Sequence, residues 1–320
     1  MDVEKRFEEL IGIMIRNTVS DLHITCGNTC VLEGRNGKSF VKIDGKPEDR
    51  NLLPFLQYIS NMDISAYTKP QSGAFIYKYR GKTYSFRFAY LVSGNVKSGV
   101  LRLLNYDKAL PLEQLVRNAE HRKIFQNWLT KDHGLILITG PTGAGKTTTA
   151  YSLAGNMRGR KVYSLEDPVE VHFREIVQIQ VNGDSGLTYA DGIRQLLRHD
   201  PDVIMIGEIR DEETAHMALR CALTGHLVIS TIHSSACKNA IIRLRDLGIS
   251  EYDLQDVLEG IANQRLYNSN PEGNRISLYE VYSKTDLEMY FKDPLYPHET
   301  LEDERKNALR KGWIQDAESV

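Results

Sequence analysis

The sequence predicts an α/β protein in which a smaller α+β domain precedes a larger domain built on parallel strands. A complete phosphate-binding loop stands between a short apolar run and a helical pattern. Short apolar runs alternate with helical patterns over residues 118–285, which indicates parallel strands joined by crossover helices. Before residue 105, strand-like runs follow a single helical pattern. The chain has 320 residues, enough for two domains.

Residues 1–105 are expected to form the α+β domain. Apolar residues over 4–16 have helical spacing, with Phe7, Leu10, Ile11 and Met14 on one face. Turns containing Gly or Pro separate the strand-like runs, which occupy residues 21–25, 37–43, 74–79, 83–91 and 99–104. We interpret residues 106–117 as a linker.

Residues 118–285 are expected to form the larger domain. Its predicted strands are residues 135–139, 161–165, 203–206 and 227–231, and its clearest helices are 189–198 and 212–223. The alternating run 176–181 predicts one further, half-buried strand. Residues 286–320 are a charged tail with a predicted helix over 302–314.

The phosphate-binding loop reads G-P-T-G-A-G-K-T and fits the pattern G-x-x-x-x-G-K-[ST] at every fixed position. Glycines let backbone N–H groups turn toward phosphate oxygens, and the following helix N-terminus adds positive potential. We expect Lys146 to reach the β- and γ-phosphates of ATP and the Thr147 hydroxyl to ligate Mg²⁺. The alternative is a glycine-rich turn before an ordinary helix. The residues expected to bind nucleotide are Gly140, Pro141, Thr142, Gly143, Ala144, Gly145, Lys146, Thr147 and Thr148.

Carboxylates follow two of the predicted strands. Glu166, Asp167 and Glu170 come after the strand at 161–165, and Glu208 follows the strand at 203–206 after one glycine. Ligands of open α/β sheets bind at the carboxyl ends of the strands, so these acids are candidates for Mg²⁺ and for the attacking water. The alternatives are a surface turn for the first group and a solvated loop acid for Glu208.

Two histidines, His226 and His233, flank the strand predicted at 227–231. An imidazole at a strand end could contact the γ-phosphate and report its presence. The alternative is a structural histidine that only hydrogen-bonds to its neighbours.

Composition gives further limits. The formal net charge is −2, so no global basic field attracts nucleic acid, and we expect no direct nucleic-acid partner. The charged N-terminus is unlike a signal peptide, and no run approaches the roughly 18 apolar residues of a membrane span. We expect a cytoplasmic protein that associates with the cytoplasmic membrane through a partner. The four cysteines, which include Cys26 and Cys30, form no C-x-x-C pair, and we expect reduced thiols and no zinc.

Four segments recur in a family-like order: G-P-T-G-A-G-K-T-T-T, E-D-P-V-E, L-L-R-H-D-P-D-V-I-M-I-G-E-I-R-D-E-E-T and A-L-T-G-H-L-V-I-S-T-I-H-S. They resemble the Walker A, Asp, Walker B and His boxes of the secretion ATPase superfamily. That superfamily includes type II secretion ATPases, type IV pilus assembly and retraction motors, and competence pseudopilus ATPases. The resemblance covers roughly residues 15–285. It implies a RecA-like P-loop ATPase domain with a smaller, PAS-like N-terminal domain.

The resemblance also implies roles for single residues. Glu170 would polarise the attacking water, Glu208 would support Mg²⁺ through water, and His226 and especially His233 would sense the γ-phosphate. In the N-terminal half, S-D-L-H-I, K-P-Q-S-G, F-R-F and L-R-L-L are similar to family segments. Arg87 and Arg102 would then reach the ATP phosphates as the N-terminal domain closes. For either arginine, the alternative is a surface salt bridge.

The family likeness further implies a homo-oligomer, most simply a hexameric ring, and an inner-membrane platform protein of a pilus or pseudopilus machine as partner. The segment Gln264-Arg265-Leu266 is not followed by the paired C-x-x-C motifs that many assembly ATPases carry. Compact length and the lack of a retraction-type helix best resemble the competence ATPase of Gram-positive bacteria. The alternatives are a retraction or type IV secretion motor, a nucleotide-gated scaffold that barely hydrolyses ATP, and a DNA translocase.

Overall fold

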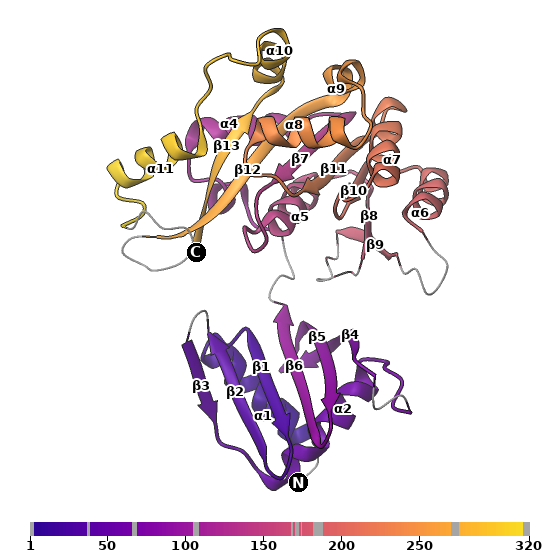
Figure 1. Cartoon of the computed structure of the whole chain (residues 1–320), viewed down its shortest axis with the longest axis vertical. Coiled ribbons are helices and arrows are strands. Elements are labelled where there is room, and N and C mark those ends of the chain that lie inside the picture. The colour runs from indigo at the N-terminus through magenta and orange to yellow at the C-terminus, as the bar shows by residue number, and fades with distance from the viewer. Residues whose placement is uncertain are drawn as a thin grey trace. The chain divides into compact units, whose positions relative to one another are not determined.

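The computed structural model describes residues 3–36, 39–65, 69–104, 109–167, 169, 173, 175–181, 188–269 and 275–315. The described residues before 105 form one compact unit, and those from 109 onward form a second (Figure 1). In these ranges, no helix combines the length and the apolarity that crossing a bilayer requires. The predicted α/β class is confirmed by the sheets described below.

The N-terminal unit is a six-stranded antiparallel sheet with the strand order β3-β2-β1-β6-β5-β4. Its strands are β1 (Asp21–Cys26), β2 (Cys30–Asn36), β3 (Ser39–Ile43), β4 (Gln71–Tyr79), β5 (Lys82–Ser93) and β6 (Val96–Leu104). All five predicted strand runs fall within or overlap these elements, and β2 was missed. Arg80 and Gly81 make the β4–β5 turn with φ of 48° and 79°, which matches a tight hairpin turn.

One face of this sheet is covered by α1 (Val3–Arg16), the 3₁₀ helix η1 (Pro47–Asn51) and α2 (Leu52–Ile59) (Figure 1). The predicted helical stripe of Phe7, Leu10, Ile11 and Met14 is fully buried there. Alternate residues of the strands complete this core, and they include Leu22, Ile24, Leu32, Phe86, Phe88 and Leu101. The opposite face of the sheet therefore carries the other set of alternate side chains.

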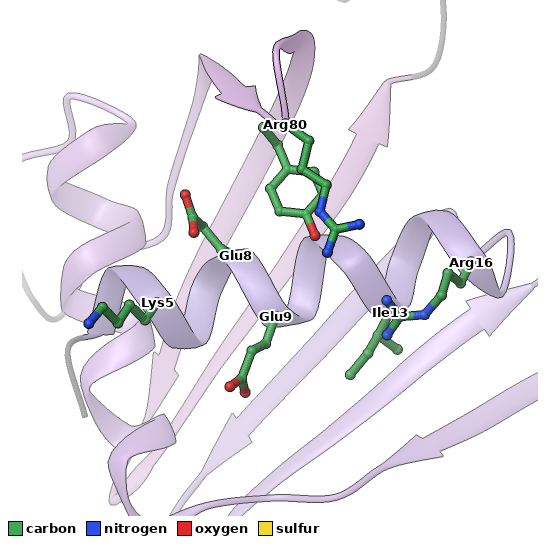
Figure 2. Close-up of a pocket in the computed structure, with 7 residues that line it drawn as sticks. Lys5, Glu8, Glu9, Ile13, Arg16 and Arg80 are labelled. Atoms are coloured by element: carbon green, nitrogen blue, oxygen red, sulfur yellow. The ribbon is translucent and has the colours of Figure 1, made fainter.

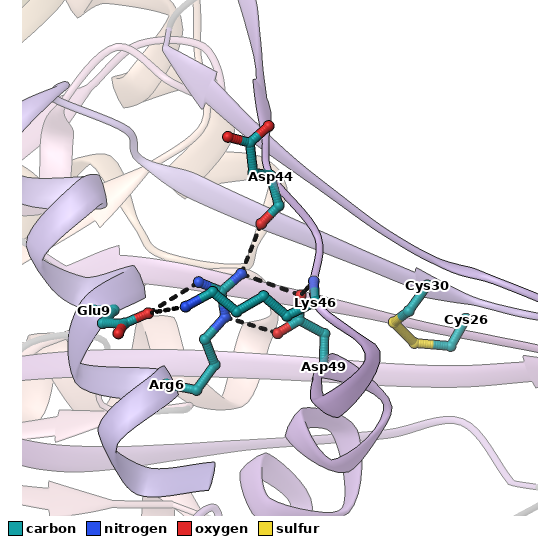
Figure 3. A network of polar contacts seen from close by, with 7 residues as sticks. All are labelled: Arg6, Glu9, Cys26, Cys30, Asp44, Lys46 and Asp49. Carbon is teal, nitrogen blue, oxygen red and sulfur yellow. Dashed lines mark hydrogen bonds and ion pairs between the residues drawn. A yellow bond between two sulfur atoms is a disulfide. The ribbon is translucent and has the colours of Figure 1, made fainter. Parts of the chain in front are cut away.

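A buried ion pair fastens α1 to the segment that precedes α2 (Figure 3). Arg6 is 3% exposed, and its guanidinium donates through Nε to Asp49 Oδ1 at 2.8 Å and through Nη2 to Asp49 Oδ2 at 3.1 Å. Arg6 also donates to the Asp44 carbonyl at 2.7 Å, and Glu9 joins Arg6 to Lys46. Because every partner is satisfied in a fixed fork geometry, this pair fixes where the two segments meet.

Cys26 and Cys30 form a disulfide (Figure 3). The two residues face each other where β1 turns back into β2. Our expectation that both are reduced thiols is therefore wrong for this pair. The reason is the missed strand β2: without it, nothing in the sequence indicates that the two cysteines lie opposite each other. Cys221 and Cys237 are free and buried.

The C-terminal unit is built on a seven-stranded sheet with the order β13-β12-β7-β11-β10-β8-β9. The pairings are parallel except for β12 with β13. The strands are β7 (Gly134–Thr139), β8 (Val162–Glu166), β9 (Ile176–Gln180), β10 (Val203–Ile206), β11 (Leu227–Ile232), β12 (Leu258–Asn268) and β13 (Arg275–Tyr282). The first five agree with the predicted strands to within two residues, and β12 and β13 were missed.

Helices cover both faces of this sheet (Figure 1). They are α3 (Leu112–Leu115), α4 (Ala119–Trp128), α5 (Lys146–Asn156), α6 (Tyr189–Leu196), α7 (Glu212–Leu223), α8 (Cys237–Asp246) and α9 (Glu251–Val257), with the 3₁₀ helix η3 (Leu197–His199) after α6. The tail adds α10 (Lys284–Lys292) and α11 (Leu301–Arg310). Ala308 and Ile314 pack on Tyr267 and Leu278 of the β12–β13 hairpin, so the tail is docked on this unit.

Candidate nucleotide site

The phosphate-binding loop follows the carboxyl end of β7, a strand whose six residues are all buried. Gly145 has a φ of 84° and caps the N-terminus of α5, a left-handed conformation that glycine adopts without steric cost. The first turn of α5 contains Lys146 and Thr147, so its free N–H groups point into the loop. The strand–loop–helix setting that the motif requires is present.

Lys146 lies inside this loop. Its side chain is mostly buried, with the residue 8% exposed, and Nζ donates to the carbonyl oxygen of Pro141 at 3.1 Å. Burial lowers the pKa of Lys146, and the negative charge of Glu208 opposes that shift. Lys146 is therefore within electrostatic reach of Glu208, which follows β10, the strand separated from β7 by β11.

Glu208 is held between two cationic or potentially cationic side chains. Arg210 Nε donates to Glu208 Oε2 at 2.7 Å, and His233 Nε2 lies 2.9 Å from Glu208 Oε1. His233 directly follows β11, whose residue Ile232 pairs with Thr139 at the start of the loop. The structure therefore brings Lys146, Glu208 and His233, three residues far apart in sequence, to one edge of the sheet.

His226 does not lie at this edge. It precedes β11, where its backbone carbonyl accepts a hydrogen bond from Gly134 at the start of β7. Its Nδ1 is 3.2 Å from Thr224 Oγ1 and 3.3 Å from the Cys221 carbonyl. His233 lies seven residues further along the chain, roughly 23 Å away at about 3.3 Å per residue. The γ-phosphate contact that we expected of His226 does not fit this position, and its bonds are those of a structural histidine.

The acidic run after β8 divides into unlike environments. Glu166 is buried, at 3% exposed, and its carboxylate accepts hydrogen bonds from Tyr151, Ser164 and Gln178 Nε2, the last at 3.1 Å. Asp167 is exposed, and Glu170, our candidate for polarising water, lies outside the described residues. Glu166 thus links α5 to β8 and β9, a role that the sequence could not indicate because its partners come from three elements.

Arg87 and Arg102 lie in the N-terminal unit on the sheet face that the helices leave uncovered. They are direct cross-strand partners, and Arg102 in turn lies opposite Asp21. Arg102 Nε donates to Asp21 Oδ1 at 2.7 Å. The carboxylate offsets the repulsion that two neighbouring arginines in one row would otherwise experience. The predicted pair is thus adjacent in space, and Asp21 is a partner that sequence reasoning missed.

A groove of about 580 Å³ lies on the same unit, along the outer side of α1 and the β4–β5 turn (Figure 2). Figure 2 shows Lys5, Glu8, Glu9, Arg16 and Arg80 along it. This groove has neither a glycine-rich loop nor a buried charged side chain among these residues, so we do not assign the nucleotide to it. The phosphate-binding loop is the better candidate because its backbone N–H groups and Lys146 are groups that bind phosphate.

Comparison with known proteins identifies the family. A family model described as type II/IV secretion system protein matches residues 2–293. The chain is 39% identical over 263 residues to the type II secretion system protein E of Pseudomonas aeruginosa, covering 80% of this chain and 52% of that protein. It is 36% identical over 270 residues to the competence protein ComGA of Bacillus subtilis, covering 82% and 76%. The chain spans about half the length of the P. aeruginosa protein and about three quarters of ComGA.

Similar solved structures are consistent with this family. The pilus retraction motor PilT with bound ADP has a TM-score of 0.75 at 26% identity, covering 96% of this chain and 94% of that chain. The Legionella pneumophila ATPase DotB has a TM-score of 0.77 at 22% identity, covering 97% and 93%, a likeness that shows the fold alone. Since the family model matches most of the chain and relatives above 30% identity cover four fifths of it, the chain belongs to the type II/IV secretion system protein family.

Proposed function

We propose that this protein is a cytoplasmic ATPase motor that uses ATP hydrolysis to drive assembly of a type IV pilus-like or competence pseudopilus. In this proposal the C-terminal unit is a RecA-like ATPase domain and the N-terminal unit is a PAS-like domain. The observation that carries the proposal is the convergence of Lys146, Glu208 and His233 beside the phosphate-binding loop.

The chain's own groups suit MgATP. The N–H groups of the loop and of the first turn of α5 would hold the phosphates, and Lys146 would exchange its Pro141 carbonyl for phosphate oxygens. The Thr147 hydroxyl and the Glu208 carboxylate are oxygen donors of the kind that Mg²⁺ prefers, and would hold the ion directly or through water. When bound, Mg²⁺ neutralises charge on the phosphates. His233, whose Nε2 lies 2.9 Å from Glu208 Oε1, would register the γ-phosphate.

The remaining roles follow from family membership. Glu170 would polarise the water that attacks the γ-phosphorus, and Arg87 and Arg102 would supply positive charge to the phosphates when the N-terminal unit closes over the site. A hexameric ring would place these closures in sequence, and an inner-membrane platform protein would receive the motion. We keep this as a hinge-closure mechanism coupled to loss of the γ-phosphate.

Within the family, two observations favour an assembly role in competence. The chain covers 76% of ComGA at 36% identity, and no cysteine pair follows Gln264-Arg265-Leu266. A retraction motor is the second candidate, because the PilT structure resembles the whole chain. Deleting the protein from cells separates the two: an assembly motor leaves no filaments, whereas a retraction motor leaves filaments that are not withdrawn.

The central test is ATP turnover against protein concentration, with mass measured by light scattering on the same samples. Lys146→Ala should lose nucleotide affinity and turnover. Glu170→Gln should keep ATP binding but slow hydrolysis by roughly 10²–10⁴-fold, the range for a lost general base. Glu175→Gln is the matched control, because Glu175 is an exposed acid five positions later in the sequence, and this variant should turn over normally.

Turnover per subunit that rises with assembly, and is lost in Glu170→Gln, supports an interface-dependent ring motor. Wild-type hydrolysis in Glu170→Gln would show that another group polarises the water. Tight ATP binding with negligible turnover at every oligomeric state would favour the nucleotide-gated scaffold.

A further inference from the structure

Strand β12 continues alongside the phosphate-binding loop after β7 has ended. The two strands pair as far as Asn263 with Thr139, and Gln264 then lies beside the loop itself. A Cβ atom added at Gly140 would stand 2.5 Å from the Gln264 carbonyl oxygen, and one at Gly145 would stand 3.0 Å from Gln264 Nε2. The loop therefore touches β12 near both its first and its last glycine.

Side-chain hydrogen bonds join the same strand to the helix that follows the loop. Thr149, fully buried in the first turn of α5, donates through Oγ1 to Gln264 Oε1 at 2.8 Å. Its Oγ1 also lies 3.2 Å from the hydroxyl of Tyr279 on β13. Gln264 Nε2 in turn donates to Ser277 Oγ at 3.0 Å. Both strands of the hairpin thus contact one threonine hydroxyl three residues after Lys146.

Tyr279 and Gln264 are both buried, and Tyr279 makes further contacts on its other side. Tyr279 is 1% exposed, its hydroxyl donates to the Leu115 carbonyl at 3.3 Å, and its ring meets Phe125 edge-on at 5.2 Å between centroids. Gln264 is also 1% exposed. Buried polar groups of this kind fix a single geometry when all are satisfied.

We propose that Gln264 and Tyr279, acting through Thr149, are positioning residues that hold the phosphate-binding loop in the shape that receives a nucleotide. This inference rests on the proposed function of the loop. None of the three side chains needs to touch the nucleotide. They act by fixing the start of α5, and thereby the backbone N–H groups and the Lys146 side chain that would contact the nucleotide.

The test compares Thr149→Val, which keeps the shape but removes the hydroxyl, with Thr149→Ser, which keeps the hydroxyl. A fluorescent ATP analogue with Mg²⁺ gives Kd by anisotropy at 25 °C, and steady-state turnover gives kcat and KM. Hydrogen exchange of the loop amides is measured in the free protein, with amides of α1 as internal reference.

We expect Thr149→Val to raise Kd and KM about 10-fold, the order that one buried hydrogen bond represents, with kcat changed less than KM. Loop exchange should quicken by a similar factor, and Thr149→Ser should restore both.

Unchanged loop exchange and unchanged Kd in Thr149→Val would overturn the proposal, even if the melting temperature falls, because the hydrogen bonds would then only stabilise the fold. Should Thr149→Val fail to fold, Tyr279→Phe decides: about 3-fold faster loop exchange supports positioning, and wild-type exchange refutes it. If the wild type binds no nucleotide, the proposed function fails, whereas the exchange measurement still tests the positioning contact.

Discussion

His121 gives a prediction whose magnitude follows from its surroundings. This histidine of α4 is buried, at 7% exposed, and its Nδ1 has no hydrogen-bond partner among the described residues. Burial, together with the nearby charges of His298 and Lys311, lowers the pKa of His121 from 6.5 to about 4, and the charge of Glu120 opposes the shift. The folded protein therefore keeps His121 neutral at pH values where the unfolded chain takes up a proton.

The difference between the folded and unfolded pKa of His121 sets the direction in which stability changes with pH. The contribution of His121 to stability is fully present above about pH 6.5 and is lost as pH falls toward 4, because only the unfolded state gains the proton. At about 1.4 kcal/mol per pH unit, the loss amounts to about 3 kcal/mol over that window. His121→Gln cannot be protonated and should remove this part of the pH dependence.

Urea unfolding followed by tryptophan fluorescence measures how the free energy of unfolding depends on pH. The chain has two tryptophans, Trp128 and Trp313, and both lie in the C-terminal unit, so the signal reports on the unit that contains His121. Between pH 7 and pH 4, His121→Gln should lose about 3 kcal/mol less than the wild type. His133→Gln, at an exposed histidine, is the control and should follow the wild type. Equal pH slopes in wild type and His121→Gln would refute the reasoning, whatever the absolute stabilities.

Two further predictions concern buried contacts. Asp49→Ala leaves the Arg6 guanidinium buried without its carboxylate partner, so the free energy of unfolding of the N-terminal unit should fall by about 3 kcal/mol, measured by urea unfolding followed by circular dichroism. The double variant Arg6→Met/Asp49→Leu should recover part of that stability. A double variant as unstable as Asp49→Ala would contradict this prediction. Gly260→Ala places a methyl group 2.2 Å from the Trp128 ring, so the C-terminal unit should lose about 1–3 kcal/mol with a shift in tryptophan emission; wild-type stability would show that the ring moves aside freely.

Regular patterns made much of the fold predictable. The run L-I-L-I-T gave β7, and helical spacing gave α7 with the bounds Glu212–Leu223 that the structure has. Strand β12 was not predicted because Asn263 and Gln264 interrupt its apolar residues. Both are buried, but only because Asn263 bonds to Glu280 and Gln264 to Thr149 and Ser277. A polar residue whose partners lie on other elements looks like a loop residue in the sequence.

The candidate site was predictable where the motif itself defines the geometry. The position of Lys146 and Thr147 at the start of α5 needed only the loop pattern, and the position of Glu208 at the carboxyl edge needed only its place after a parallel strand. His226 and His233 look alike in sequence because each adjoins the same apolar run. Only the strand direction separates them, since β11 runs from His226 at the amino edge to His233 at the carboxyl edge.

The acidic run shows why position at a strand end is not enough to assign catalysis. Glu166 ends β8 at the carboxyl edge, where a catalytic acid is expected. Its oxygens already accept hydrogen bonds from Tyr151, Ser164 and Gln178, so polarising a water would require breaking bonds that tie α5 to β8 and β9. A buried, satisfied carboxylate of this kind maintains the architecture behind the loop. The family resemblance assigns the attacking water to Glu170, which therefore remains the residue to test.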